Sequence, residues 1–363
     1  MKIAYEGRWM NRGPISGRVL TRGYLQGFYE NLSSGDTIDV LTNNNGTDHN
    51  FDSRVSFYNM PSSNPLLVAG ALVPYYAWKR NCDYALFQFV APFTRLRKVR
   101  TATIVYDVIV EEHPEYFSQK EKFLLKVLKH NCKNVDIVFA ISEYTRQQLI
   151  RFKYADEKNV YVSYCGFPIG RGLGKPTSSN VLPKLSISNP YCLYVGRLNP
   201  RKNLDRLVKA FLERRSHYPH DLIIVGESDP NFEDFRGQLT PDEAKRVIFL
   251  GRVSSEDLTE LYLGASLFVY VPFLEGFGLP ILESLNYGVP CLTSNTSSLP
   301  EVGGEACHYV DPRSQSEIGQ AIELLLTDQE TLGRLRRNIP AQIKKFDWTS
   351  TAKMMLGILA ERT

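Results

Sequence analysis

The sequence predicts an α/β protein built from two doubly wound domains, and three observations support this. Strand-like apolar runs alternate with helical patterns along most of the 363 residues, which is typical of parallel sheets covered by helices. A chain of this length exceeds one ordinary α/β core. Residues 171–190 are rich in Gly, Ser, Pro and Asn, and this composition indicates a linker between the two halves.

The expected elements follow that alternation in chain order. In the first half, strands are expected at residues 2–5, 101–106 and 135–140, with a helix from about residue 17. In the second half, the expected strands are 191–195, 222–225, 247–250, 267–271 and 290–293. Helices are expected between them, at 203–214 and 255–264. The domains are therefore placed at residues 1–182 and 183–345, and two such domains facing each other are expected to leave a cleft. Ligands of these sheets bind beyond the carboxyl ends of the strands.

The length and composition agree with an ordered, soluble enzyme, which is expected to be cytoplasmic. Charged residues make up 23% of the chain and aromatic residues 12%, which argues against disorder. The six cysteines show no C-x-x-C spacing and are expected to be reduced, buried thiols. The first residues are interpreted as a strand, with no signal peptide. The longest mostly apolar run, residues 65–78, is interrupted by Gly70 and Pro74 and is too short to span a bilayer.

The net charge of +4 is uneven, because the excess of Lys and Arg lies in the first half. Part of it lies in a helical pattern at 117–133, where four lysines recur on one face: Lys122, Lys126, Lys129 and Lys133. One interpretation is a solvated helix face. The other is peripheral attachment to the inner face of an anionic membrane. No nucleic-acid partner is expected, because no RNA- or DNA-binding motif accompanies the charge.

The stretch 273–283 carries two carboxylates, Glu275 and Glu283, eight positions apart with glycines between them. A buried strand is predicted just before it, and Pro280 suits the first turn of a helix. We therefore expect Glu275 on a strand-to-helix loop and Glu283 about one turn into the helix. Free N–H groups at a helix N-terminus attract anions, and carboxylates can accept from sugar and ribose hydroxyls. The stretch predicts a nucleotide-sugar site.

A second motif, residues 195–202, follows the first expected strand of the second half. Gly196 permits a tight turn, while Arg197 and Lys202 can place two cations near one anion. Such a pair can replace a metal ion in holding a leaving diphosphate. The sequence shows no Asp-x-Asp and no His/Cys cluster with ligand spacing, so no metal and no other cofactor is expected.

These motifs, with Leu-Pro-Glu-Val-Gly-Gly at 299–304 and weaker matches at 16–18, 104–107, 113–117 and 141–145, resemble the retaining GT-B glycosyltransferases of family 4. The spacing of Glu275 and Glu283 matches that family's E-x7-E motif. The resemblance implies two Rossmann-like domains facing across a cleft, and a last helix, within 346–363, that crosses back to the first domain. It also implies front-face retention without a protein nucleophile, so that the protein mainly stabilises the departing diphosphate.

The resemblance assigns roles at the matching positions. Arg197 and Lys202 would hold the donor diphosphate, Glu283 would bind the ribose, and Glu275 would meet the transferred sugar. In the first domain, a loop over 13–18 would face the diphosphate, with glycines allowing close backbone approach. The remaining donor-binding positions are Gly13, Gly17, Arg18, Gly196, Arg252, Val253, Gly276, Phe277, Gly278 and Leu279.

One position departs from the family pattern. Relatives carry His-Asp after the strand equivalent to 101–105, whereas this chain has Tyr106 and Asp107. The family's histidine is expected to contact the donor sugar or to stabilise its developing charge, and Tyr106 cannot carry that positive charge. Tyr106 can still hydrogen-bond a sugar hydroxyl, and Asp107 can bind the acceptor. A catalytically weak, nucleotide-sugar-binding partner subunit is therefore the alternative to an active transferase.

The sequence Glu-Gly-Phe-Gly-Leu-Pro at 275–280 resembles that of mannosyl- and rhamnosyltransferases of surface-polysaccharide pathways. It favours transfer of mannose or a deoxy relative from a GDP-sugar, with a UDP- or dTDP-sugar as the alternative donor. The expected acceptor is a glycan or a lipid-linked glycan, and the latter would account for the basic face of the first domain.

Overall fold

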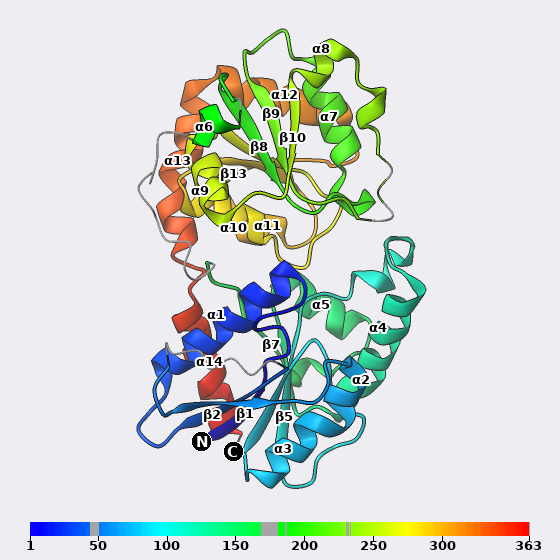
Figure 1. Ribbon diagram of the computed structural model, residues 1–363, viewed down its shortest axis with the longest axis vertical. Helices are drawn as coiled ribbons and strands as arrows, with labels where there is room; N and C mark the ends of the chain where they lie inside the picture. Colours follow the sequence, from blue (N-terminus) through cyan, green and yellow to red (C-terminus); the bar gives the residue numbers. More distant parts are fainter. Residues whose placement is uncertain (44–50, 168–180, 186, 230–231, 233, 363) are drawn as a thin grey trace. The chain divides into compact units, whose positions relative to one another are not determined.

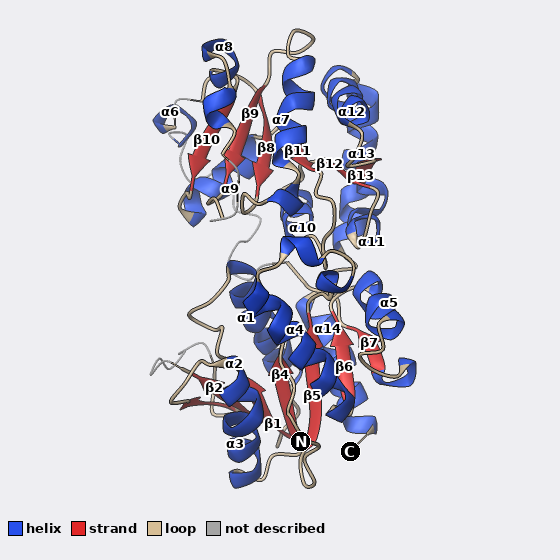
Figure 2. Cartoon of the chain, turned by 90° about the vertical axis from the view of Figure 1, so that its right-hand side faces the viewer, coloured by secondary structure: helices blue, strands red, loops and turns tan. Residues whose placement is uncertain are grey.

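The computed structural model describes residues 1–43, 51–167, 181–185, 187–229, 232 and 234–362. The contacts divide the chain into two compact units: unit 1, residues 1–169 with 346–363, and unit 2, residues 170–345. Each unit is an α/β layer structure around one parallel sheet, as Figures 1 and 2 show. The chain has the predicted α/β fold class with two Rossmann-like units.

Unit 1 contains a seven-stranded sheet in the order β3-β2-β1-β4-β5-β6-β7, with every pairing parallel. Its central strands are buried because helices cover both faces, as expected for near-continuous apolar runs. The strands are β1 (Lys2–Glu6), β2 (Thr37–Thr42), β3 (Val55–Asn59), β4 (Tyr84–Gln88), β5 (Arg100–Val105), β6 (Ile137–Ala140) and β7 (Val160–Val162).

The α-helices of unit 1 connect these strands and cover the sheet. They are α1 (Ile15–Asn31), α2 (Pro65–Leu67), α3 (Val73–Lys79), α4 (Gln119–Asn131), α5 (Glu143–Arg151) and α14 (Trp348–Glu361). A five-residue π-helical segment, Val68–Leu72, joins α2 to α3. The run at 65–78 therefore forms a continuous helical segment, and Val73 and Ala77 pack it onto the strands of the sheet.

The last helix, α14, packs against α1 inside unit 1. The Trp348 ring lies against the backbone of α1, where a Cβ at Gly23 would be 2.2 Å from the ring. The indole Nε1 donates to the carbonyl of Phe167 over 2.7 Å, and Tyr84 donates to the carbonyl of Leu359 over 2.8 Å. The C-terminal segment is therefore part of unit 1.

Unit 2 contains a six-stranded parallel sheet in the order β10-β9-β8-β11-β12-β13. Its strands are β8 (Tyr191–Val195), β9 (Asp221–Val225), β10 (Val247–Gly251), β11 (Leu267–Tyr270), β12 (Cys291–Ser294) and β13 (Cys307–Val310). Its α-helices are α6 (Val181–Lys184), α7 (Leu204–Glu213), α8 (Pro241–Ala244), α9 (Ser255–Gly264), α10 (Leu279–Asn286), α11 (Leu299–Gly303), α12 (Gln315–Thr327) and α13 (Gln329–Ile343).

Two sequence expectations about segments need correction. The linker predicted at 171–190 contains the helix α6, which packs against α9, and residues 171–180 lie outside the described part of the chain. The lysine stripe is incomplete, because α4 ends at Asn131 and Lys133 falls in the 3-10 turn that follows. Lys129 contacts Glu111 over 3.0 Å, so it does not belong to an open basic face.

All six cysteines are buried free thiols, as predicted. Among the described residues, no helix combines the length and the apolar character needed to cross a bilayer.

Candidate functional site

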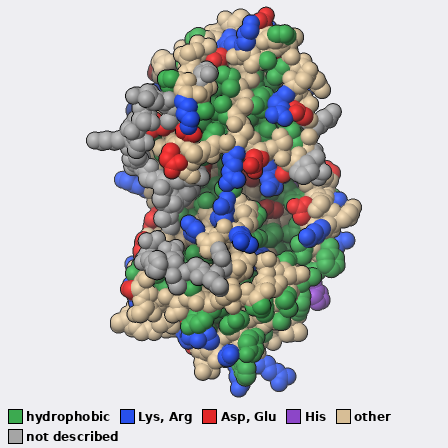
Figure 3. All heavy atoms as spheres, in the orientation of Figure 1, with side chains coloured by type: hydrophobic (Ala, Val, Ile, Leu, Met, Phe, Trp, Pro, Cys, Tyr) green, Lys and Arg blue, Asp and Glu red, His purple; other side chains and the backbone are tan. Residues whose placement is uncertain are grey.

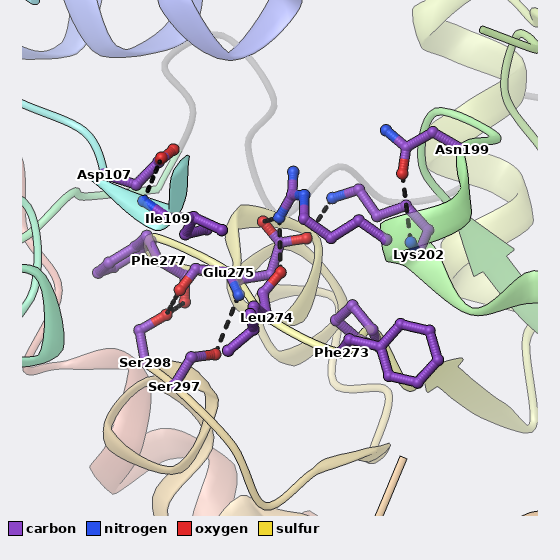
Figure 4. Close-up of polar contacts among 12 residues, drawn as sticks. Asp107, Ile109, Asn199, Lys202, Phe273, Leu274, Glu275, Phe277, Ser297 and Ser298 are labelled. Carbon is purple, nitrogen blue, oxygen red and sulfur yellow. Dashed lines mark hydrogen bonds and ion pairs between the residues drawn. The ribbon is translucent and has the colours of Figure 1, made fainter. Parts of the chain in front are cut away.

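The loop between β11 and α10 holds Glu275 at the carboxyl edge of the unit 2 sheet, as the sequence predicted. Two serines after β12 fix the loop: the Glu275 N–H donates to Ser297 Oγ over 3.0 Å, and the Ser298 hydroxyl lies 2.7 Å from the Phe277 carbonyl (Figure 4). Gly278 has φ +112°, a conformation that glycine adopts without strain, and α10 begins at the next residue.

The Glu275 carboxylate is almost completely buried and lies among two cations and a phenol. Lys202 Nζ pairs with its Oε1 atom (Figure 4), and Arg201 Nη1 lies 3.0 Å from its Oε2 atom. The Tyr270 hydroxyl, at the end of β11, donates to Oε1 over 2.7 Å. Burial alone would raise the pKa of Glu275, but Arg201, Lys202 and the hydrogen bonds from Lys202 and Tyr270 lower it to about 2. The carboxylate is therefore ionised at neutral pH.

The short loop between β8 and α7 explains why two consecutive cations reach the same carboxylate. Pro200–Lys202 form a single 3-10 turn, and the Asn199 side chain accepts from the Lys202 N–H over 3.2 Å (Figure 4). Asn203 then adopts a left-handed conformation with φ +59°, and its side chain bonds to the carbonyls of Val271 and Pro312. This turn directs Arg201 and Lys202 toward the Glu275 loop.

Of the two predicted cations, the structure brings Lys202 to Glu275 and places Arg197 elsewhere. Arg197 Nη1 lies 3.1 Å from Asp229 Oδ1, and 64% of its side chain is exposed. Arg201, which the sequence analysis did not select, is the second cation that contacts Glu275. The sequence offered one signal for it, namely that Arg201 is adjacent to Lys202 in a turn that contains Pro200. The role of Arg197 toward a diphosphate stays a prediction.

Glu283 lies in α10, about one turn after its start, which confirms its predicted placement. It is buried, and the Tyr262 hydroxyl of α9 donates to its Oε2 atom over 2.9 Å. The Tyr262 ring stacks on Tyr287 with a centroid distance of 5.2 Å, so the Tyr262 hydroxyl that contacts Glu283 has a fixed position. The sequence analysis missed Tyr262, because no local motif links it to a glutamate 21 residues away.

The N-terminal end of α10 presents the backbone of the remaining donor-binding positions of this loop, namely Gly276, Phe277, Gly278 and Leu279. Phe277 is buried, and its carbonyl accepts from Ser298, which holds the loop backbone in place. The N–H groups of a helix's first turn carry partial positive charge. This end of α10 can therefore interact with phosphate or sugar oxygens, as predicted.

The other donor-binding positions of unit 2 lie after β10 and β8 of the same sheet. Arg252 and Val253 follow β10, and Arg252 contacts Glu227 over 3.9 Å with both side chains largely exposed. Gly196 follows β8, but the position that requires a glycine is Gly226 after β9, where a Cβ would lie 1.9 Å from the Gly196 carbonyl oxygen. The close backbone approach is therefore between the ends of β8 and β9.

The loop predicted at 13–18 in unit 1 is only partly a loop. The helix α1 begins at Ile15 after Pro14, so Gly17 and Arg18 lie in its first turn. Gly13, with φ +113°, and Gly17 both lie against the Trp9 ring, where a Cβ would come within 2.5 Å and 2.8 Å of ring carbons. In the structure, both positions require glycine because they lie in close contact with the Trp9 ring. Proximity to a diphosphate stays a prediction.

Tyr106 and Asp107 follow β5 at the carboxyl edge of the unit 1 sheet, as predicted. The Tyr106 ring stacks on Phe89 at 5.3 Å and lies 5.6 Å from Trp9, and its hydroxyl donates to Gln88 Oε1 over 2.7 Å. Asp107 Oδ1 accepts from the Ile109 N–H over 3.2 Å (Figure 4), which caps a 3-10 turn. Both residues thus have structural contacts beside any role toward a ligand.

In the described residues, no group of three or more His, Cys, Asp or Glu side chains is arranged to hold a metal ion. The chemistry that the unit 2 site offers is electrostatic: two partly buried cations, a buried carboxylate and a helix N-terminus at the carboxyl ends of parallel strands.

Comparison with known proteins identifies the family. A model described as "Glycosyl transferases group 1" matches residues 183–342. O-antigen chain mannosyltransferase B of Escherichia coli is 32% identical over 283 residues, which cover 75% of this chain and 73% of that protein. O-antigen chain mannosyltransferase RfbU of Salmonella typhimurium is 25% identical over 266 residues, covering 72% and 70%. Sucrose-phosphate synthase from Thermosynechococcus elongatus has a similar fold, with a TM-score of 0.73 at 20% identity over 99% of this chain and 98% of that one.

The fold and the site define a glycosyltransferase of the GT-B type. The chain belongs to the glycosyl transferases group 1 family.

Proposed function

We propose that this chain is a retaining mannosyltransferase that transfers mannose, or a close deoxy relative, from a GDP-sugar to a growing glycan or glycolipid without a metal ion. The similarity to two O-antigen chain mannosyltransferases, which covers most of both proteins, supports the choice of sugar and of acceptor class. The guanine nucleotide is inferred from that similarity. A UDP- or dTDP-sugar is the alternative donor.

The observation that carries the proposal is the pairing of Arg201 and Lys202 with the buried Glu275. A departing nucleoside diphosphate develops negative charge as the glycosidic bond breaks. Two cations held in a turn can stabilise that charge without reorganising during the reaction, which is the role that a metal ion plays in other transferases. In this proposal the diphosphate shares the cations with Glu275, and Glu275 accepts from a hydroxyl of the transferred sugar.

The remaining parts of the site fit the same donor. Glu283, oriented by Tyr262, would accept from the ribose hydroxyls, and the N-terminus of α10 would contact sugar or phosphate oxygens. In unit 1, Tyr106 would bind a sugar hydroxyl and Asp107 the acceptor. A front-face reaction of this kind needs no protein nucleophile, so the account assigns none.

A transfer assay tests the proposal. The purified chain is incubated with GDP-mannose, UDP-glucose or dTDP-rhamnose and with a set of mannose-terminated acceptors, in EDTA, and the anomeric configuration of the product is determined by NMR. Formation of an α-mannoside from α-linked GDP-mannose is expected. Transfer only from a UDP- or dTDP-sugar would show that the proposed GDP-sugar donor is wrong. A β-product would exclude a retaining reaction. Nucleotide binding without transfer would favour the partner-subunit alternative.

We also propose that unit 1 makes peripheral contact with an anionic membrane, where a lipid-linked acceptor would lie. Lys126 is exposed on α4 and Lys122 is partly exposed. Hydrophobic side chains also gather over α2 and α3 on the face shown in Figure 3. Tyr75 and Trp78, both in α3, are at least half exposed. Trp and Tyr favour the headgroup level of a bilayer, and lysines favour anionic lipids.

A further inference from the structure

The hydroxyl of Tyr270, at the end of β11, lies between the two opposite charges of the unit 2 site. It is 2.5 Å from Lys202 Nζ and 2.7 Å from Glu275 Oε1. Lys202 Nζ also contacts the same carboxylate oxygen directly (Figure 4), so the ammonium, the phenol and the carboxylate form a closed group of three. Tyr270 is fully buried, so water does not compete for its two hydrogen bonds.

The chemistry of the three groups fixes the direction of both hydrogen bonds. An ammonium group can only donate, and an ionised carboxylate can only accept. Tyr270 Oη therefore accepts from Lys202 and gives its single proton to Glu275. Burial, and then the charge of Glu275, hold the pKa of Tyr270 well above its ordinary value of 10, so the phenol keeps its proton at neutral pH. Glu275 thus receives a hydrogen bond from a neutral donor in addition to its contacts with the cations.

The ring of Tyr270 is held by packing at the end of the sheet. Its centroid lies 5.8 Å from that of Tyr194 on β8 and 6.0 Å from that of Phe268 on the same strand. Gly196 leaves space beside these rings, because a Cβ at that position would lie 3.4 Å from Tyr270 Cε2 and 3.1 Å from Tyr194 Oη. The two cations, in contrast, come from the loop between β8 and α7. The phenol therefore reaches Glu275 from the sheet itself.

A bound diphosphate would change the surroundings of Glu275. In the proposed reaction the diphosphate shares Arg201 and Lys202 with the carboxylate, which weakens the contacts that keep Glu275 ionised and in place. Burial favours the protonated form of a carboxyl group that loses its cations. The hydrogen bond from Tyr270 is not shared with the diphosphate, because the phenol is buried and its proton faces Glu275.

We propose that Tyr270 is a positioning residue of the donor site, which holds Glu275 in place for the transferred sugar while the diphosphate engages Arg201 and Lys202. This inference rests on the proposed glycosyltransferase reaction and adds to it a residue that acts only through its neighbours. It separates two properties of the site, because the cations serve the diphosphate and the phenol serves the sugar through Glu275. The two properties can be measured separately, since GDP carries only the diphosphate whereas GDP-mannose carries both groups.

Titration calorimetry of the full chain with GDP and with GDP-mannose, in EDTA and without an acceptor, measures both properties. The variants are Tyr270→Phe, which removes the hydroxyl and keeps the ring, and Tyr191→Phe as the matched control. Tyr191, at the start of β8 in the same sheet, is also buried and donates its hydroxyl to the Leu261 carbonyl over 2.8 Å. Both variants lose one buried hydroxyl, so general damage to unit 2 should affect them alike. Melting temperatures are recorded for all three proteins.

In the parent, GDP-mannose is expected to bind more tightly than GDP, because Glu275 accepts from a hydroxyl of the mannose. In Tyr270→Phe this advantage should shrink roughly tenfold, as for loss of a hydrogen bond to a charged group, while the Kd for GDP stays within about twofold. With an acceptor present, kcat/KM should decline on acidification from a higher pH than in the parent, since loss of a donor raises the pKa of Glu275 from about 2. Tyr191→Phe should keep the parent's ratio of the two Kd values and its pH profile.

The inference is overturned if Tyr270→Phe keeps the parent's ratio of the two Kd values, including the case in which it weakens GDP and GDP-mannose equally through a purely structural effect. A change of the ratio by the same factor in Tyr191→Phe would overturn it as well. These results differ from a failure of the proposed function. In that case the parent chain itself binds neither GDP nor GDP-mannose, and the inference fails with it.

Discussion

Glu275 is the residue on which the unit 2 site depends most, because a buried carboxylate keeps two cations in place. Its contacts come from two loops and the end of a strand: Lys202 and Arg201 after β8, Ser297 after β12, and Tyr270 at the end of β11. Sequence reasoning could place Glu275 and Glu283, because glycines, a proline and an apolar run mark the strand-loop-helix around them. It could not find Arg201, Tyr270 or Tyr262, because contacts between distant side chains leave no periodic signal in the chain.

Glu275→Gln tests the energetic role of this carboxylate. The pKa of Glu275 falls from an ordinary value of 4.5 to about 2, so the ionised group stabilises the folded state by about 3 kcal/mol above pH 4.5. Because the pKa is lowered on folding, this contribution is lost as the pH falls toward 2. Urea unfolding should show the parent more stable than the variant at pH 6, with a difference that shrinks between pH 4.5 and 2. Glu361→Gln, at an exposed glutamate, serves as the control.

A pH-independent difference between the parent and Glu275→Gln would contradict this account, because it would mean that the charge of Glu275 contributes nothing. The same result would remove the reason for assigning Arg201 and Lys202 to a shared site.

Arg197→Ala tests whether the exposed Arg197 reaches the donor. The ion pair with Asp229 is largely solvent-exposed on the arginine side and therefore weak, so a diphosphate can compete for the guanidinium. Arg197→Ala should raise the Kd for GDP roughly tenfold or more, as for loss of a charge-assisted hydrogen bond. Asp229→Asn is the matched control, since it releases Arg197 and should leave the Kd unchanged or lower. Equal weakening by both variants, measured by calorimetry, would argue that the pair only supports the loop.

At the scale of elements, the alternation of apolar runs with helical patterns was enough to predict the core strands β1, β5, β6 and β8 to β12. It missed β2, β3, β4, β7 and β13. β3 and β7 are only half-buried, so their apolar pattern is weak. The order of the strands in a sheet depends on pairing between residues far apart in the chain, which a local pattern does not record. The start of α1 was misplaced by two residues although Pro14 directly precedes it, which is a known signal for a helix start. A short helix inside a Gly/Ser-rich segment, such as α6, gives no such signal.

Gly23→Ala tests the packing of α14 on α1. A Cβ at Gly23 would overlap the Trp348 ring, so the variant should lose about 1–3 kcal/mol of unfolding free energy as the helices are forced apart. The matched control is Gly357→Ala on α14, where a Cβ meets nothing within 4 Å and the higher helix propensity of alanine should add up to about 1 kcal/mol. Urea denaturation measures both. If Gly23→Ala were as stable as Gly357→Ala, close packing of Trp348 on α1 would be wrong.

The helix α4 offers a test of membrane contact. Replacing Lys122 and Lys126 together by Gln should reduce binding to vesicles that contain anionic lipid, because each lysine contributes about 1 kcal/mol near such a surface. Lys129→Gln also removes positive charge, but Lys129 pairs with Glu111, so it should affect binding less. Cosedimentation at low and high salt measures the effect. A parent chain that binds no vesicles at either salt concentration would contradict the membrane proposal.

At the scale of the whole molecule, each unit places its candidate site residues at the carboxyl edge of its own parallel sheet. In unit 1 Tyr106 and Asp107 follow β5, and in unit 2 Lys202 and Glu275 follow β8 and β11. This arrangement follows from the fold, because loops after parallel strands meet at one edge. Sequence comparison assigns the family, whereas the donor and the acceptor are proposed from the similarity to the O-antigen chain mannosyltransferases.

The most direct test of the central claim is titration calorimetry of the full chain with GDP, UDP, dTDP and ADP in the presence of EDTA. The account predicts that GDP binds most tightly of the four nucleotides without a metal ion. Lys202→Met and Arg201→Met should each weaken GDP binding at least tenfold. Guanosine, which has no diphosphate, should bind equally weakly to the parent chain and to both variants. GDP binding that requires a divalent cation, or that is unchanged in both variants, would contradict a donor site built on Arg201, Lys202 and Glu275.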